Sequence, residues 1–310
     1  MTSPGGVTNL PWLDPRLYQS RVSRAEAEAF CRALAERHYE NFTVVSFLLP
    51  RPLRQHFANV YAYCRVSDDL ADEIGDRERA LSRLAEWGSH LDRCYEGEST
   101  HPVFVALAAT IREFDIPKGP FADLLVAFRQ DQLQTRYRTW QELLGYCANS
   151  ANPVGRLVLH LSGYRDERRR LLSDATCTAL QLANFWQDVA RDYERGTIYV
   201  PEEVMRAHGY SEELLARRVA DERWTALMED LIGRTRALFA QGLELPRLIP
   251  GRLRLAIELF SRGGLAVLRA IERECRYDTL HRRPALSRRR KALLIAAALT
   301  RSSSGLRERA

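Results

Sequence analysis

The residues of this 310-residue chain that could do chemistry gather in two short segments rich in aspartate. In the first segment the stripe is formed by Tyr61, Arg65, Asp68 and Asp72, with Asp69 beside it. Steps of three and four residues place side chains on one face of a helix, because a helix turns about 100° per residue. Carboxylates one turn apart repel each other unless a cation compensates them. The spacing therefore predicts a face that attracts cations.

The second segment has the same design. Its stripe consists of Gln181, Asn184, Asp188, Asp192 and Arg195. Large apolar residues occupy the other faces of both segments, and a helix that is apolar on most sides is buried. Carboxylate oxygens bind Mg²⁺, which commonly completes its shell with water and substrate phosphate oxygens, while arginines can bind the phosphates directly. Two such stripes facing each other would surround a cavity suited to a diphosphate.

Each motif also has an ordinary interpretation. The DDxxD pattern of the first segment alone is as typical of a helix end with surface acids, and the second stripe is what favours a metal site. Tyr146 and Tyr199 could stabilise a carbocation through their ring faces, or orient water through their hydroxyls. For Tyr146 the alternative is a core tyrosine with a satisfied hydroxyl.

The elements that must position these residues are almost all helical in period. Helices are expected over residues 23–37, 53–72, 77–95, 103–114, 120–134, 140–150, 154–161, 167–193, 211–216, 222–242, 253–275 and 287–299. The one alternating stretch, Thr197–Val200, is too short to build a sheet. We expect one all-α domain over residues 19–300, a flexible N-terminal arm over 1–18 and a flexible basic tail over 301–310.

Composition excludes several classes of protein. The apolar fraction of 45% and the mean hydropathy of −0.34 are those of a globular protein. The net charge of +6 comes from the segment Arg282–Ala310, so nucleic-acid binding is not expected. The six cysteines form no CxxC pair, which argues against zinc and favours thiols in a reducing cytoplasm. No apolar run can span a bilayer, but Arg288–Lys291 could contact an anionic membrane surface, the alternative being a solvated helix end.

These segments, with Tyr146-Cys147 and Val154-Gly155 between them, resemble the squalene/phytoene synthase family of head-to-head prenyl transferases over residues 38–291. The resemblance implies a single-domain, all-α isoprenoid-synthase helical bundle around a central cavity. It implies ionisation of a prenyl diphosphate with Mg²⁺, or Mn²⁺ as the alternative metal. The metal-site residues that it implies are Asp68, Asp69, Asp72, Asn184, Asp188 and Asp192. The substrate or diphosphate residues that it implies are Asn41, Phe42, Tyr61, Arg65, Gln181, Asn184, Arg195 and Tyr199. Tyr146 is then the candidate for proton transfer.

A narrower resemblance concerns four blocks of sequence. The blocks His38–Phe42, Ser46–Pro50, Ala151–Arg156 and Phe185–Val189 look like the hydroxysqualene synthases of the bacterial hopanoid pathway. Where the wider family has small or basic residues, or arginine, this chain has Glu40, Asn41, Gln187 and Thr197. Each lost arginine removes a charge-assisted hydrogen bond to phosphate, worth about 1.5–3 kcal/mol.

Fewer phosphate-binding arginines suggest a site that handles one diphosphate at a time. The expected reaction is ionisation of presqualene diphosphate and capture of the rearranged cation by water, without NADPH. The first alternative is a presqualene diphosphate, phytoene or dehydrosqualene synthase that condenses two prenyl diphosphates. The second is a catalytically silent assembly protein, which the intact acidic motifs disfavour. A redox enzyme acting on the product and a membrane surface are the partners considered.

Overall fold

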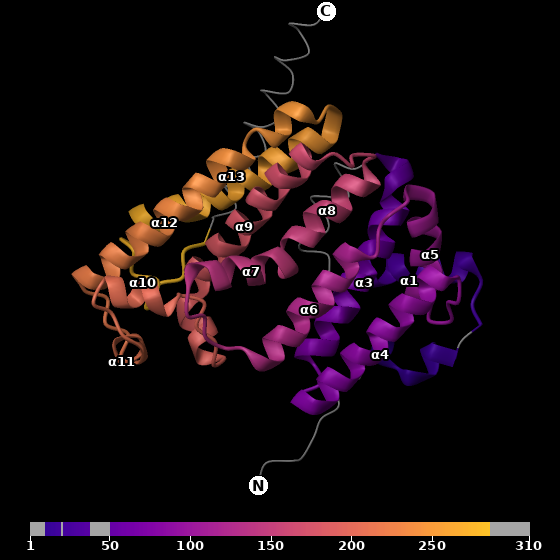
Figure 1. The fold of residues 1–310 in the computed structure, drawn as a ribbon, viewed down its shortest axis with the longest axis horizontal. Coiled ribbons are helices and arrows are strands. Elements are labelled where there is room, and N and C mark those ends of the chain that lie inside the picture. Colours follow the sequence, from indigo (N-terminus) through magenta and orange to yellow (C-terminus); the bar gives the residue numbers. More distant parts are fainter. Residues whose placement is uncertain (1–9, 20, 38–49, 286–310) are drawn as a thin grey trace, which may run out of the picture. The chain divides into compact units, whose positions relative to one another are not determined.

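A computed structural model describes residues 10–19, 21–37 and 50–285 (Figure 1). The all-α prediction is confirmed, because the described residues form helices and no strand beyond one isolated parallel bridge between Arg136 and Ile198. The predicted site residues Asn41 and Phe42 lie outside the described residues, as do the expected last helix over 287–299 and the basic tail. No helix of the described part combines the length and the apolar character needed to cross a membrane.

The chain divides into two compact units. The first unit is Met1–Leu133 with Arg156–Arg165, and the second unit is Gln134–Gly155 with Asp166–Ala310. The prediction of a single domain over residues 19–300 stays a prediction.

Helix α3 is the central element of the first unit. It packs against four neighbouring helices of that unit. The central helix α3 spans Arg54–Asp72, and its four neighbours are α1 (Arg24–Arg37), α4 (Arg77–Glu96), α5 (Pro102–Phe114) and α6 (Gly119–Leu133). The aromatic core includes Tyr63, whose ring lies 6.0 Å from that of Trp87 and whose hydroxyl donates to the carbonyl of Phe121 at 2.9 Å. This fully buried core fixes the helix that carries the first aspartate motif.

Local sequence signals set the helix ends. The backbone N–H of Ser23 donates to Glu26 Oε2 at 2.8 Å, and the N–H of Glu26 donates to Ser23 Oγ at 3.3 Å. This reciprocal arrangement is a capping box at the start of α1. A short 3₁₀ helix, Arg51–Leu53, leads into α3, with Pro52 near its start. Proline lacks the N–H that a helix interior needs, so it is tolerated at this position.

Residues 10–18 were expected in a flexible arm, yet they are ordered on the first unit. They form two 3₁₀ helices, Pro11–Leu13 and Pro15–Gln19. Trp12 is only 7% exposed. Proline at the first position of each turn fixes φ in the helical range, and the buried indole removes a large apolar surface from water.

The second unit is organised around the 28-residue helix α9 (Glu167–Glu194), against which α12 and α13 pack (Figure 1). Its other helices are α7 (Trp140–Ser150), the first turn of α8 (Asn152–Leu161), α10 (Glu202–Ala207), α11 (Glu212–Ala216), α12 (Glu222–Gly242) and α13 (Gly251–Arg273), with a 3₁₀ helix at Leu245–Leu248. Asp166 caps α9 by accepting from the N–H of Arg169 at 3.0 Å. The short helix α10 was not predicted, since six residues are too few to show a periodic face.

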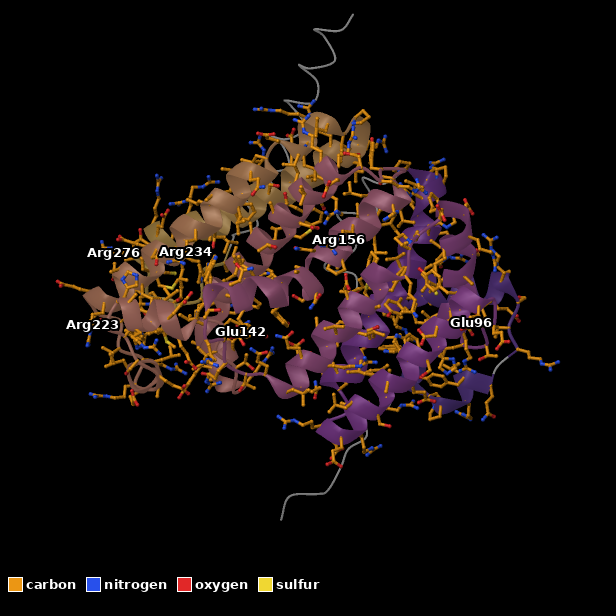
Figure 2. The ribbon with its side chains drawn as sticks, in the orientation of Figure 1. Glu96, Glu142, Arg156, Arg223, Arg234 and Arg276 are labelled. Carbon is orange, nitrogen blue, oxygen red and sulfur yellow. The ribbon has the colours of Figure 1, made fainter. Side chains whose placement is uncertain are left out.

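Helix α7, which carries Tyr146, is held by its first residue. The ring of Trp140 stacks on Trp186 of α9 with centroids 6.3 Å apart. The guanidinium of Arg234 on α12 lies 5.2 Å from the Trp140 ring and pairs with Asp230 at 2.7 Å (Figure 2). A cation over an aromatic face is attracted by the ring quadrupole, so α7, α9 and α12 are joined at one point.

Candidate active site

The first aspartate motif lies on the last turns of α3. Asp68 is half-buried, Asp69 is fully buried and Asp72 is exposed. Helix α3 ends directly after the motif, where the N–H of Glu73 donates to the carbonyl of Asp69 at 3.0 Å. Of the three aspartates of the motif, the two that belong to the predicted stripe, Asp68 and Asp72, are at least partly exposed, and Asp69 beside the stripe is not.

Arg65 joins two of these aspartates. Its Nη1 lies 3.1 Å from Asp68 Oδ2, and its Nη2 donates to Asp69 Oδ1. The other oxygen of Asp69 accepts the indole N–H of Trp12 at 2.6 Å. The Nε of Arg65 is buried and has no hydrogen-bond partner among the described residues. A buried donor of this kind fits an acceptor such as a phosphate oxygen.

The charge state of Asp68 is set by its surroundings. Burial and then the neighbouring charge of Asp72 raise the pKa of Asp68 to about 6, and Arg65 opposes this shift. Burial also raises the pKa of Tyr61, one turn before Arg65. Two carboxylates with incomplete compensation make a face that favours an additional cation.

The second stripe lies on α9 up to Asp192, and its last member, Arg195, is the C-cap residue of that helix. Asn184 is exposed, while Gln181, Asp188 and Asp192 are half-buried. Burial and then the charge of Asp188 raise the pKa of Asp192 to about 7. Arg195, at the C-terminal end of the helix, opposes this shift. As in the first motif, burial and a carboxylate one turn away together raise the pKa of an aspartate.

Arg283 is a site residue that sequence reasoning missed. Its Nε lies 2.5 Å from Asp188 Oδ1 and its Nη2 lies 2.9 Å from Oδ2. The buried side chain of Gln187 donates to the carbonyl of Pro284, the next residue of the same segment. Arg283 belongs to the basic segment Arg282–Ala310, and no local pattern links it to α9.

An aromatic cluster stands beside the second stripe. Phe185 and Tyr199 stack with ring centroids 3.7 Å apart and planes inclined by 8°. The ring of Tyr146 lies 5.8 Å from Tyr199 and 6.2 Å from Phe185. Tyr137, which was not predicted, lies 5.6 Å from Tyr146. The cluster brings both predicted tyrosines together, with Tyr146 and Phe185 buried and Tyr199 half-buried.

The structure thus assembles each stripe within its own unit. Within the described residues no three or more His, Cys, Asp or Glu side chains form a group that could hold a metal ion. A complete metal site requires donors from both stripes, or from one stripe and the substrate. That the two stripes face each other stays a prediction.

Comparison with known proteins identifies the family. The sequence profile described as squalene/phytoene synthase matches residues 35–290. The 15-cis-phytoene synthase of Synechococcus elongatus is 31% identical over 244 residues, which are 75% of this chain and 79% of that protein.

Solved structures agree with this assignment. The structure of squalene synthase HpnC from Alicyclobacillus acidocaldarius is 43% identical with a TM-score of 0.78, covering 83% of this chain and 97% of that one. A dehydrosqualene synthase solved in complex with a ligand is 26% identical with a TM-score of 0.79, covering 91% and 98%. The matched profile spans most of the chain and includes both aspartate motifs. The chain therefore belongs to the squalene/phytoene synthase family.

Proposed function

We propose that this protein is a hydroxysqualene synthase that converts presqualene diphosphate and water into hydroxysqualene and pyrophosphate. One observation carries the proposal. The fold is equally similar to squalene synthase HpnC and to the dehydrosqualene synthase, with TM-scores of 0.78 and 0.79, but the sequence identity is 43% to the first and 26% to the second. Since the fold is equally similar to both, the higher sequence identity to the first is what supports the proposal.

The donor set fits a magnesium-diphosphate complex. Asp68 and Asp72 on α3 and Asn184, Asp188 and Asp192 on α9 would hold the metal, which is Mg²⁺ or, alternatively, Mn²⁺. Burial and a neighbouring carboxylate raise the pKa of Asp68 and of Asp192, and a bound cation would favour their charged forms; the buried Nε of Arg65 lacks an acceptor among the described residues. When bound, the metal neutralises the diphosphate and makes it a better leaving group. Asp69, which the resemblance also implies as a ligand, has both oxygens engaged and is better suited to support Arg65.

The residues of this chain then bind and orient the substrate. Arg65 and Arg195 are the candidates to bind phosphate oxygens, and Arg283 supplies a further guanidinium next to Asp188. Gln187 is neutral, and its amide donates to the backbone carbonyl of Pro284. A neutral side chain at this position is consistent with one diphosphate rather than two.

The aromatic cluster has a role in protecting the cation. Departure of pyrophosphate with the electrons of the C–O bond leaves a cyclopropylcarbinyl cation that must rearrange before water reaches it. The ring faces of Phe185, Tyr199 and Tyr146 stabilise positive charge and exclude water. The hydroxyl of Tyr146 is the candidate to orient the attacking water, which loses one proton as the alcohol forms. No hydride is transferred, so NADPH is not required.

A condensing enzyme is the second candidate. The 31% identity to a 15-cis-phytoene synthase supports it, because such an enzyme would join two prenyl diphosphates. Both candidates share the metal stripes and differ in the number of diphosphates bound at once.

One assay separates these functions. The purified protein is incubated with presqualene diphosphate or with farnesyl diphosphate, with and without Mg²⁺ and NADPH, and the products are identified by mass. We expect an alcohol from presqualene diphosphate that depends on Mg²⁺ and not on NADPH. Asp72→Asn serves as the low-activity control. Efficient formation of presqualene diphosphate from farnesyl diphosphate alone would instead establish condensation, and no turnover of any prenyl diphosphate would favour an assembly protein.

The location and partners follow from the same proposal. An intermediate as apolar as hydroxysqualene has to pass to an enzyme that removes its hydroxyl reductively, so a redox enzyme is the proposed partner. We also propose a cytoplasmic location with contact to an anionic membrane surface through the basic residues that follow Ala285. Binding of the full chain to vesicles with and without anionic lipid tests this contact.

A further inference from the structure

The N-terminal segment Leu10–Gln19 reaches the aspartate motif of α3 through one indole. Trp12 Nε1 donates to Asp69 Oδ2 at 2.6 Å, although the two residues are 57 positions apart. The indole is 7% exposed and the carboxylate 0%. A carboxylate removed from water is costly unless donors replace the lost hydration, so the indole is half of what compensates Asp69.

The other half is Arg65, and it connects Asp69 to the candidate active site. Arg65 Nη2 donates to Asp69 Oδ1, and Nη1 lies 3.1 Å from Asp68 Oδ2. The remaining donor, Nε, is buried and without a partner among the described residues. One continuous series of polar contacts therefore runs from Trp12 through Asp69 and Arg65 to Asp68 within the first unit.

The geometry of Asp69 divides its two oxygens between two donors. Carboxylates commonly bind a guanidinium through both oxygens, in a paired geometry that uses two N–H groups. The indole occupies Oδ2 and so restricts Arg65 to one oxygen of Asp69. The guanidinium is left able to contact Asp68 and to present its Nε.

We propose that Trp12 is a positioning residue for Arg65: by occupying one oxygen of Asp69 it keeps the guanidinium oriented to bind a diphosphate oxygen. This inference rests on the proposed function, because it needs a diphosphate as the ligand. Without the indole N–H, both oxygens of Asp69 are available to the guanidinium of Arg65. The resulting two-pronged contact moves the guanidinium away from Asp68 and from the ligand. The N-terminal segment thereby becomes part of the substrate site.

The test measures binding of inorganic pyrophosphate by calorimetry in the presence of Mg²⁺. Trp12→Phe keeps an aromatic ring and removes the N–H, and we expect about tenfold weaker pyrophosphate binding, the value of one charge-assisted hydrogen bond. In an Asp69→Asn background the same substitution is expected to change the affinity for pyrophosphate less than about twofold, since a neutral amide attracts a guanidinium less than a carboxylate does. A merely structural role would give equal losses in both backgrounds.

A matched control removes a different buried indole donor. Trp224 Nε1 in the second unit donates to the carbonyl of Tyr277 at 2.9 Å, and the residue is fully buried. Trp224→Phe therefore loses the same kind of hydrogen bond and is expected to retain the wild-type affinity for pyrophosphate. Thermal unfolding of each variant establishes that the folded protein is being compared.

A second measurement does not depend on the stability of Trp12→Phe. In the ¹⁵N-labelled wild-type chain, the Trp12 indole resonance, assigned through Asp69→Asn, is expected to shift when pyrophosphate and Mg²⁺ are added. An unshifted resonance together with unchanged affinity of folded Trp12→Phe would overturn the inference alone. A wild-type protein that binds no pyrophosphate with Mg²⁺ would overturn the proposed function and this inference with it.

Discussion

Arg283 and Asp188 form a two-pronged ion pair in which both carboxylate oxygens are contacted, at 2.5 and 2.9 Å. The pair joins residues 95 positions apart and places a segment from the C-terminal part of the second unit on the acidic stripe of α9. Nearby, Arg191 Nη1 lies 3.7 Å from Asp188 Oδ1 on the same helix. A guanidinium from a distant segment is therefore held on the stripe, next to a carboxylate proposed as a metal ligand.

Replacing Arg283 tests whether this guanidinium serves the ligand. Arg283→Leu is expected to weaken pyrophosphate binding with Mg²⁺ about tenfold, because a charge-assisted hydrogen bond to phosphate is lost. The free energy of unfolding should fall by less than about 1 kcal/mol, because the pair is partly exposed. The matched control is Arg282→Leu, whose exposed side chain is the immediate neighbour. Equal affinity of both variants would show that Arg283 serves the ion pair alone.

The pKa of Asp192 makes stability depend on pH. Burial and the charge of Asp188 raise this pKa from 3.8 to about 7. Between these two pH values the carboxyl of Asp192 is protonated in the folded protein and ionised in the unfolded chain. Stability contributed by the protonated form is therefore lost as pH rises through this window, and the penalty is complete above about pH 7. Asp192→Asn should raise the free energy of unfolding by about 1–2 kcal/mol at about pH 8 and have little effect near pH 4, after discounting for solvent screening.

Chemical denaturation at several pH values measures this effect. The control is Glu167→Gln, an exposed acid in the first turn of the same helix, for which the pH profile should follow the wild type. Mg²⁺ with pyrophosphate favours the charged form of Asp192, so adding both at about pH 8 should stabilise the wild type more than the variant. An identical pH profile for wild type and Asp192→Asn would contradict the argument.

Local periodicity was sufficient to predict the helices that carry the site. The stripe at Asp68 and Asp72 and the stripe at Asp188 and Asp192 were predicted from steps of three and four residues, and each lies on one helix as expected. The capping box at Ser23 has the same short range, since its partner Glu26 is three residues away. Spacings of three and four residues can be read directly from the sequence, because the interacting residues lie in adjacent helical turns.

Contacts between distant segments could not be predicted in this way. The bond from Trp12 to Asp69 joins residues 57 positions apart, and nothing in the residues around Trp12 distinguishes it from an ordinary apolar anchor. The pairing of Arg283 with Asp188 was hidden by the excess of arginine around it, which indicated a solvated tail. Burial also cannot be predicted from the local sequence, because Asp68 and Asp69 are neighbours in one motif and only Asp69 is fully buried.

The close contact between α9 and α12 gives a prediction for stability. A Cβ added at Gly242 would lie 2.2 Å from Thr176 Oγ1 and 3.2 Å from Thr176 Cα, so Gly242→Ala requires the two helices to separate. Overpacking of this kind costs about 1–3 kcal/mol. At Gly233 on the same helix an added Cβ would have no atom within 4 Å among the described residues, and Gly233→Ala should stabilise by up to about 1 kcal/mol through helix propensity. Equilibrium unfolding of both variants checks the opposite signs, and a stabilised Gly242→Ala would contradict the packing.

The hydroxyl of Tyr146 is the group to which the proposed reaction assigns the orientation of water. Tyr146→Phe keeps the ring 5.8 Å from Tyr199 and 6.2 Å from Phe185 while removing the hydroxyl. We expect kcat with presqualene diphosphate to fall about 100-fold with KM nearly unchanged, because a positioned proton-transfer group acts on the chemical step.

Product analysis and a second tyrosine complete this test. Less alcohol and more eliminated hydrocarbon among the products of Tyr146→Phe would show that water is no longer oriented. The control is Tyr210→Phe, in which a buried hydroxyl that donates to the carbonyl of Val219 at 2.8 Å is lost elsewhere in the same unit. That variant should lose about 1 kcal/mol of stability and keep its kcat and products. If Tyr146→Phe behaves like Tyr210→Phe, its hydroxyl serves packing, and the water must be oriented by another group of the site.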